Sequence, residues 1–328
     1  MEQNPTSATV EYVRFEKSDI LKNLIVQKMK TLILLISLSF ASVTYAQTDS
    51  LRLKIEHIIA SKKADIGVAI DEFESDTLSI NGNKHFPMES VFKFHLAVAV
   101  LIEVDKGKLS LDQKVPVKKS DLLPNTWSPL RDKYPNGNIE LTLSDLLSYT
   151  VSHSDNNGCN ILFELMGGTK KIDTVIHNLG IKDVSIQATE KEMSKSWNVQ
   201  FGNWTTPLAA IDLLKKFNNG EVLTKKSTDF LWRIMTETST GKNRIKGKLP
   251  MGTIVAHKTG TSGTNAHGVT AAINDIGIIV LPNGKHVAIS VFVVNSKEKT
   301  DVNEKIIADI TKATWDYYIK LFSIHGTP

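Results

Sequence analysis

The sequence predicts a mixed α+β fold, in which an antiparallel sheet built from both ends of the chain is flanked by terminal helices and carries an inserted all-helical domain. Two observations lead to this prediction. Segments with the period of strands gather near the beginning and the end of the chain, whereas helical periods dominate its middle. The 328 residues are 41% hydrophobic and 23% charged, an ordinary globular composition that can bury a large core.

A leader is expected before the fold. An uninterrupted apolar run covers residues 32–43, after a basic start and before the small residue Ala46. This pattern is typical of a secretory signal peptide and is too short to span a bilayer. We therefore expect a signal peptide over residues 29–46, cleaved after Ala46, and an upstream extension of the reading frame over residues 1–28. The only cysteine, Cys159, lies far from the cleavage point, so neither a lipid anchor nor an internal disulfide is expected.

Residues 47–85 are expected to begin the sheet domain. Apolar residues follow a helical period at 51–59, and alternating runs at 66–70 and 77–80 then predict the two strands of a hairpin. Residues 86–239 are expected to form the helical domain, because apolar residues spaced by three or four recur there. The expected helices cover 91–104, 141–147, 160–166, 171–179 and 207–217.

Residues 240–328 are expected to complete the sheet domain. An amphipathic helix is predicted over 304–320, where it would cover the sheet. Asn283 and Gly284 form a pair that favours a tight hairpin turn between two of the strands. A cleft between the sheet domain and the helical domain is the expected site. Runs rich in β-branched residues predict strands at 254–258, 269–273, 276–281 and 286–294.

Charge and histidine content exclude some classes of function. The 39 Lys and Arg residues exceed the 35 Asp and Glu residues only slightly, for a formal net charge of +4, and they are spread along the chain. Nucleic acid is not an expected partner, because no basic stripe could follow a phosphate backbone. The 9 histidines show no spacing typical of a zinc site, so neither a metal nor a cofactor is expected.

Ser90 and Lys93 form an S-x-x-K motif at the expected start of a helix. Residues three apart share one face of a helix, so the Lys93 amine can reach the Ser90 hydroxyl, and the helix dipole favours negative charge there. Such an arrangement activates a serine nucleophile. The motif alone is weak, because it recurs at Ser296 and Lys299 in a charged segment that we assign to the surface.

Two further motifs strengthen this interpretation. Residues 154–156 read S-D-N, and residues 258–260 read K-T-G at the end of a predicted strand. With the three motifs in this order, the sequence resembles class A β-lactamases and penicillin-binding proteins. The resemblance spans nearly all of the chain after the leader. It implies the two-domain fold of that family and a β-lactam as substrate.

The resemblance implies a role for each motif residue. Ser90 attacks the lactam carbonyl after its proton passes to Lys93 or, through a water, to Glu190. Ser154 hands a proton to the departing nitrogen, supported by Lys93 and Lys258. The backbone N–H groups of Ser90 and Thr261 form the oxyanion hole. The residues expected to bind the substrate are Trp127, Asn156, Thr259, Gly260, Thr261, Ser262 and Arg244; Trp127 as mere packing and Arg244 as a plain surface residue are the alternatives.

Hydrolysis of the acyl-enzyme separates the β-lactamases from their relatives. Class A β-lactamases carry a catalytic glutamate in a loop between S-D-N and K-T-G, whereas the transpeptidases and peptidases lack it. Glu190 matches this position, because the loop exit at 203–207 then aligns without a gap, and Glu192 is the rival. Asn160 matches the residue that braces the loop. Glu190 therefore favours hydrolysis.

Three departures from the usual class A pattern concern the loop and the substrate-binding arginine. Ala188 and Asn203 replace the Arg and Asp that clamp the loop, so no salt bridge is expected to close it. Ser194 replaces the Asn that shares the deacylating water. Asn274 stands near the usual position of the substrate-binding arginine, and Arg244 matches an alternative position for it. These features resemble the PER/VEB-type branch, which implies a widened site and an extended cephalosporin spectrum.

Two alternatives from other classes remain open. A DD-peptidase would be acylated by β-lactams and release them slowly, which Glu190 argues against. A non-hydrolytic β-lactam sensor would be anchored by a membrane segment, and none is expected after cleavage. Steady turnover of a chromogenic cephalosporin would distinguish a β-lactamase from both alternatives. We expect a periplasmic or secreted monomer, with Cys159 buried and His257 pointing into the packing rather than into the cleft.

Overall fold

The computed structural model describes residues 27–30, 50–73 and 77–324. Contacts between Cα atoms divide the chain after Leu53, and the fold described below is that of the residues beyond this point. Most of the expected signal peptide, including its cleavage point at Ala46, lies outside the described residues. Within the described part of the chain, no helix has both the length and the apolar character needed to cross a membrane.

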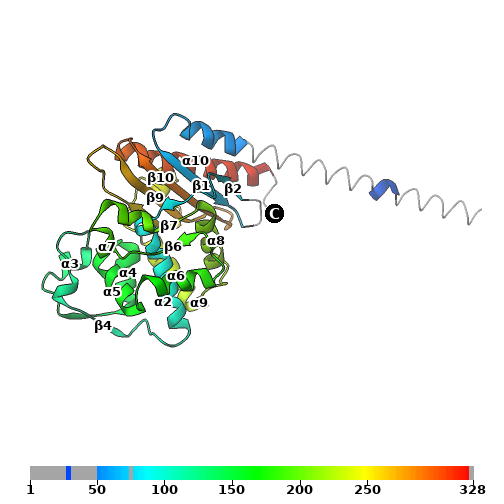
Figure 1. The fold of residues 1–328 in the computed structure, drawn as a ribbon. Helices are drawn as coiled ribbons and strands as arrows, with labels where there is room; N and C mark the ends of the chain where they lie inside the picture. The colour runs from blue at the N-terminus through cyan, green and yellow to red at the C-terminus, as the bar shows by residue number, and fades with distance from the viewer. Residues whose placement is uncertain (1–26, 31–49, 74–76, 325–328) are drawn as a thin grey trace, which may run out of the picture. The chain divides into compact units, whose positions relative to one another are not determined.

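A five-stranded antiparallel sheet combines strands from both ends of the chain (Figure 1). Its order is β2-β1-β10-β9-β8, so the first strand of the fold pairs with the last. The predicted α+β class with an antiparallel sheet is confirmed. The strands are β1 (Asp65–Asp71), β2 (Leu78–Ile80), β8 (Val255–Thr261), β9 (Thr270–Val280) and β10 (His286–Ser296).

β9 is one continuous strand of 11 residues where the sequence predicted two. The expected break falls at Asn274 and Asp275, a polar pair that is fully buried. Asn274 Nδ2 donates to the carbonyl oxygen of Pro87 over 2.8 Å, and Asp275 accepts the N–H of Ile245 over 3.2 Å. Polar side chains that find partners inside the protein do not have to interrupt a strand, so the predicted break was wrong.

The helices come mainly from the middle of the chain. α2 is buried from residue 92 to residue 103, which makes it a core helix rather than a surface one. α10 contacts β9 and β10, whereas α8 contacts β1 and β10 from the other face of the sheet (Figure 1). The helices are α2 (Phe92–Asp105), α3 (Pro129–Lys133), α4 (Leu143–Ser152), α5 (Asn156–Met166), α6 (Thr169–Asn178), α7 (Glu190–Met193), α8 (Pro207–Asn218), α9 (Lys225–Thr236) and α10 (Thr300–Ile324).

Several helices differ from the sequence prediction, α4 and α9 among them. α4 begins at Leu143, because the residues before it form β5 (Ile139–Thr142), which pairs with β4 (Lys114–Val117). The Thr142 side chain accepts the N–H of Asp145 and so caps the helix. α9 was not predicted, although residues such as Leu231 are buried on one side of it. The boundaries expected for an inserted helical domain, 86–239, stay a prediction.

A small sheet places two loops beside each other. It has the order β3-β7-β6, with β3 (Phe86–Pro87), β7 (Trp204–Thr205) and β6 (Val184–Ser185). β3 leads into the S-x-x-K segment, whereas β6 and β7 lie at the two ends of the loop that carries Glu190. The pairing of β3 with β7 therefore brings that loop to the start of α2.

Candidate active site

The three sequence motifs and the glutamate loop meet at one pocket of about 290 Å³. Its walls come from segments that are far apart in the sequence. Six of the predicted site residues do not line the pocket: Lys93, Lys258, Gly260, Ser262, Arg244 and Asn160. The lining residues are Glu89, Ser90, Trp127, Ser154, Asn156, Glu190, Thr240, Thr259 and Thr261.

Ser90 lies in the single turn of 3₁₀-helix η1 (Glu89–Val91), which leads directly into α2. Its hydroxyl donates a hydrogen bond to Glu190 Oε1 over 3.3 Å. We expected the Ser90 hydroxyl to meet Lys93, which lies one turn further along. In the structure the hydroxyl is hydrogen-bonded to the glutamate, and Lys93 contacts the same carboxylate.

Lys93 joins three separate parts of the site. Its ammonium group is fully buried and lies 2.8 Å from Glu190 Oε1. It also donates to Asn156 Oδ1 over 2.6 Å and to the carbonyl oxygen of Ser154 over 2.8 Å. An ammonium group has three donors, so these acceptors match its capacity, and a buried charge needs such partners to be tolerated. Lys93 thus holds the glutamate loop and the S-D-N turn against α2.

Ser154 and Lys258 form a second polar contact in the site. Ser154 has a φ of 56°, in the left-handed region that is uncommon for residues other than glycine. Its hydroxyl accepts a hydrogen bond of 2.9 Å from Lys258 Nζ, which also donates to the carbonyl oxygen of Thr259 over 2.9 Å. Burial, assisted by the charge of Lys93, holds the pKa of Lys258 well below its usual range. A lysine in this state gives up a proton more readily than one in water.

Asp155 organises the turn that presents Ser154 and Asn156. The carboxylate is fully buried and accepts the N–H groups of Leu130 over 2.7 Å and Gly158 over 2.8 Å. As the N-cap of α5 it satisfies an otherwise unpaired amide of the helix start. Asp155 was not predicted as a site residue, although it is the central residue of the S-D-N motif.

Trp127 stands at the mouth of the pocket with 60% of its surface exposed. Its indole Nε1 donates to the carbonyl oxygen of His153 over 2.9 Å, and its own carbonyl oxygen accepts the N–H of Asn156 over 3.0 Å. The exposed ring is therefore anchored to the S-D-N turn rather than packed in the core.

β8 passes close to the segment before Ser90. A Cβ atom on Gly260 would lie 2.3 Å from the carbonyl oxygen of Met88, so no larger residue fits in the K-T-G motif. The hydroxyl of Thr259 lies 2.6 Å from that of Thr240, a lining residue that the sequence analysis missed because it belongs to no motif. Ser262 Oγ accepts the N–H of Ala272 over 2.8 Å and so closes the end of the strand.

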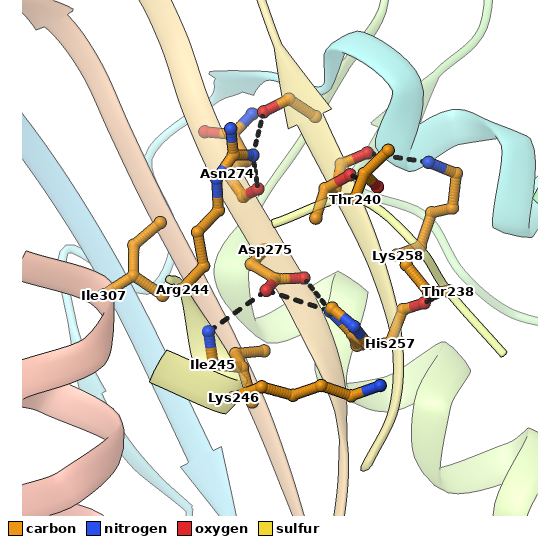
Figure 2. A network of polar contacts seen from close by, with 12 residues as sticks. Thr238, Thr240, Arg244, Ile245, Lys246, His257, Lys258, Asn274, Asp275 and Ile307 are labelled. Carbon is orange, nitrogen blue, oxygen red and sulfur yellow. Dashed lines mark hydrogen bonds and ion pairs between the residues drawn. The ribbon is translucent and has the colours of Figure 1, made fainter. Parts of the chain in front are cut away.

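Arg244 is buried beside β8 and β9 rather than exposed at the surface, with 4% of its area accessible (Figure 2). Its guanidinium donates to the carbonyl oxygens of Gly260 and Asn274, each over 2.9 Å, and to Thr261 Oγ1 over 2.8 Å. Arg244 Nε also pairs with Glu304 over 3.1 Å. The contact of Arg244 with the pocket therefore runs through the Thr261 hydroxyl.

His257 and Asp275 form a fully buried pair between β8 and β9, with Nδ1 of the histidine 2.9 Å from Oδ1 of the aspartate (Figure 2). Because Asp275 also accepts the N–H of Ile245, the pair links both strands to η4 (Ile245–Lys248), which directly follows Arg244. The expectation that His257 points into the packing is confirmed. Cys159 is also fully buried, as expected, and burial raises the pKa of its thiol well above the usual range.

The two glutamates of the loop have different positions. Glu190 is the first residue of α7, and its side chain is only 10% exposed where it meets Lys93. Glu192 is exposed, and its carboxylate accepts the N–H of Thr189 over 2.8 Å while the Thr189 hydroxyl accepts the N–H of Glu192 over 3.2 Å. This reciprocal capping box occupies Glu192 outside the pocket. Asn160 Oδ1 accepts the N–H of Lys191 over 3.1 Å.

The ends of the glutamate loop are joined by a neutral clamp. Asn203 is fully buried, and its Oδ1 accepts the N–H groups of Gln187 over 2.8 Å and Ala188 over 2.9 Å. Its Nδ2 donates to the carbonyl oxygen of Ala188 over 2.7 Å. No salt bridge joins Ala188 and Asn203, as expected, and hydrogen bonds to the backbone take the place of the ion pair. Ser194 donates to the carbonyl oxygen of Lys191 over 2.9 Å, within its own short helix.

Comparisons with known proteins agree with this geometry. A family model described as "Beta-lactamase enzyme family" matches residues 50–318. Beta-lactamase VEB-1 of Pseudomonas aeruginosa is 54% identical over 294 residues, which cover 88% of this chain and 98% of that protein. Extended-spectrum beta-lactamase PER-1 of the same organism is 44% identical over 305 residues, covering 92% and 98%. The crystal structure of TLA-3 extended-spectrum beta-lactamase is 60% identical, with a TM-score of 0.82 over 83% of this chain and 99% of that chain.

Proposed function

Since this chain belongs to the class A β-lactamase family and hydrolyses β-lactams, we propose that the reaction proceeds through an acyl-enzyme on Ser90, which is hydrolysed by a water activated by Glu190. This proposal rests on the position of one carboxylate oxygen, Glu190 Oε1. Glu190 Oε1 lies 3.3 Å from the Ser90 hydroxyl and 2.8 Å from Lys93 Nζ. The resemblance to the PER/VEB-type branch is confirmed by the similarity to VEB-1 and PER-1.

In acylation, Ser90 Oγ attacks the lactam carbonyl carbon while its proton leaves toward Glu190, directly or through a water, or toward Lys93. Negative charge develops on the carbonyl oxygen, and the N–H groups of Ser90 and Thr261 are proposed to stabilise it. The carbon–nitrogen bond of the ring then breaks, and Ser154 gives its proton to the nitrogen. Lys258 donates to Ser154 Oγ over 2.9 Å, and its depressed pKa favours resupply of that proton.

Deacylation follows from the loss of one hydrogen bond. Once Ser90 Oγ is part of an ester, it has no proton to donate to Glu190 Oε1. That oxygen then becomes available to accept a hydrogen bond from a water, which it deprotonates for attack on the ester. The bond between the carbonyl carbon and Ser90 Oγ then breaks, and the serine regains its proton from Glu190. Lys93 stays paired with the carboxylate over 2.8 Å, which holds Glu190 in place.

The substrate is proposed to include oxyimino cephalosporins, because PER-1 and TLA-3 are both named extended-spectrum enzymes. The hydroxyls of Thr259, Thr261 and Thr240 line one side of the pocket, with Lys258 and Arg244 hydrogen-bonded to residues of that wall. This wall suits the carboxylate that penicillins and cephalosporins share. Asn156 and Trp127 lie on the pocket wall as contacts for the amide side chain.

The enzyme is further proposed to act as a monomer outside the cytoplasm, in the periplasm or secreted, after cleavage following Ala46. The signal-peptide pattern of residues 29–46 supports this location.

The mechanism is tested with a matched pair of glutamate variants. Glu190→Gln should accumulate an acyl-enzyme with a penicillin, seen as a mass increase of the intact protein, because acylation can still use Lys93 while water activation is lost. Glu192→Gln should turn over without a trapped adduct. Ser90→Ala should form no adduct and show no turnover. An adduct on Glu192→Gln but not on Glu190→Gln would refute the assignment, and slow release by the wild-type protein would favour a DD-peptidase.

A further inference from the structure

Glu89, the residue before the nucleophile, combines two unfavourable features. It lies at a φ of 47°, in the left-handed region, and only 5% of its surface is exposed. Its Oε1 atom has no hydrogen-bond partner among the described residues. A strained backbone and an unpaired buried carboxyl oxygen both cost free energy, and such features gather at functional sites. Glu89 also lines the pocket, although it belongs to none of the sequence motifs.

Charged groups face Glu89 from two other elements. Glu190, on α7, repels a negative charge on Glu89, whereas Lys93, on α2, attracts it. Lys93 already lies 2.8 Å from Glu190, so its charge is largely committed to that carboxylate. Burial, followed by repulsion from Glu190 and opposed by Lys93, raises the pKa of Glu89 to about 8. At neutral pH Glu89 is therefore the neutral acid.

The sheet offers Glu89 no free counter-charge. A Cβ atom on Gly260 of β8 would lie 3.1 Å from Glu89 Cβ, so the two backbones are in close contact. The charged residue of β8, Lys258, is hydrogen-bonded to Ser154 and Thr259. On β9, Asp275 is engaged with His257. Lys93 is therefore the cation that would attract an ionised Glu89.

We propose that Glu89 is a positioning residue for the Ser90 centre, that it supports turnover only as the neutral acid, and that its ionisation sets the alkaline limit of activity. The proposal rests on the proposed function of Ser90, Lys93 and Glu190. While Glu89 is uncharged, Lys93 stays on Glu190, and Glu190 keeps its contact with the Ser90 hydroxyl. A negative charge on Glu89 would pull Lys93 away from Glu190 and push Glu190 away from the serine.

The test is the pH dependence of kcat/KM for a chromogenic cephalosporin. Each profile is scaled to its own maximum, so that a uniform loss of activity does not matter. In the wild type, a residue that ionises near pH 8 leaves about one tenth of the maximal rate at pH 9. In Glu89→Gln, which cannot ionise, the alkaline limb should move up by at least about one pH unit. Glu89→Met, also unable to ionise, should show the same shift if charge is the cause.

Glu103→Gln is the matched control. Glu103 is a buried glutamate on the same helix as Lys93, but it pairs with Lys106 over 3.1 Å and lies outside the pocket. This variant should keep the wild-type profile. An alkaline limb that stays in place in both Glu89 variants would overturn the proposal and assign the limb to a lysine such as Lys258. A missing adduct on Glu190→Gln in intact-mass measurements would instead refute the proposed function itself.

Discussion

Replacing Asn203 by alanine tests whether the neutral clamp holds the glutamate loop. The Asn203→Ala change removes a hydrogen bond to Met193 Sδ over 3.2 Å and three hydrogen bonds to the backbone. The three backbone bonds join its side chain to the N–H of Gln187 and to both the N–H and the carbonyl oxygen of Ala188, and they lie between 2.7 and 2.9 Å. Because Asn203 is fully buried and Ala188 is buried, water does not readily replace the lost partner.

The magnitude follows from the number of backbone groups left unpaired. A buried polar group without a partner costs about 1–3 kcal/mol. At about 1 kcal/mol for each group, the low end of this range, the free energy of unfolding should fall by about 3 kcal/mol. Local opening of the loop limits the loss, since an opened loop lets water reach the same groups. The low end is therefore the appropriate value.

Loss of the clamp in Asn203→Ala should also lower the rate of deacylation more than the rate of acylation. α7, which carries Glu190, lies between the two clamped ends of the loop, at Ala188 and Asn203. A loosened loop displaces Glu190 from its contact with Lys93, whereas Ser90 stays in η1 and Lys93 stays on α2. The measurements are urea unfolding of the free enzyme, and stopped-flow hydrolysis of a cephalosporin followed by intact-mass analysis. We expect a burst and accumulation of the acyl-enzyme.

Asn198→Ala is the matched control, because Asn198 is an exposed asparagine of the same loop. Its free energy of unfolding should lie within about 0.5 kcal/mol of the wild-type value. The reasoning is refuted if Asn203→Ala is as stable as this control and deacylates at the wild-type rate. Such a result would mean that the pairing of β6 with β7 holds the loop without help from Asn203.

Two further predictions concern substrate breadth and the buried pair in the sheet. Oxyimino cephalosporins should be hydrolysed with kcat/KM within about tenfold of simple cephalosporins, a gap of about 1.4 kcal/mol, because a neutral clamp leaves no unpaired charge when the loop yields. Steady-state kinetics on both substrates checks this, and a thousandfold preference against the oxyimino compound would contradict it. Asp275→Asn should lower the free energy of unfolding by about 1–3 kcal/mol and raise KM more than it lowers kcat, because Asp275 links His257 to the segment after Arg244. Thermal unfolding and steady-state kinetics measure both effects, and an unchanged KM would show that Arg244 is held without the pair.

Local patterns in the sequence were sufficient for much of the fold. The alternation at 66–70 and the Asn283-Gly284 pair identified strands of the sheet, because the period of buried side chains is a local property of a strand. The prediction failed at Asn274 and Asp275, where polarity resembles a loop. Their partners, such as Pro87 and His257, lie on other segments, and no local pattern reveals that a buried polar group is satisfied.

The candidate site divides in the same way. The sequence by itself determined the S-x-x-K, S-D-N and K-T-G motifs, and the resemblance to the family that these motifs carry identified Glu190 as the match for the catalytic glutamate. Only the tertiary structure decided that Lys93 contacts Glu190, that Glu192 caps its own helix, and that Asn203 replaces an ionic clamp. It alone showed Glu89 as a buried carboxyl group beside the nucleophile. The physical reason is that hydrogen bonds and charge effects in a buried site act between side chains that are near in space, and the chain brings these together only when it folds.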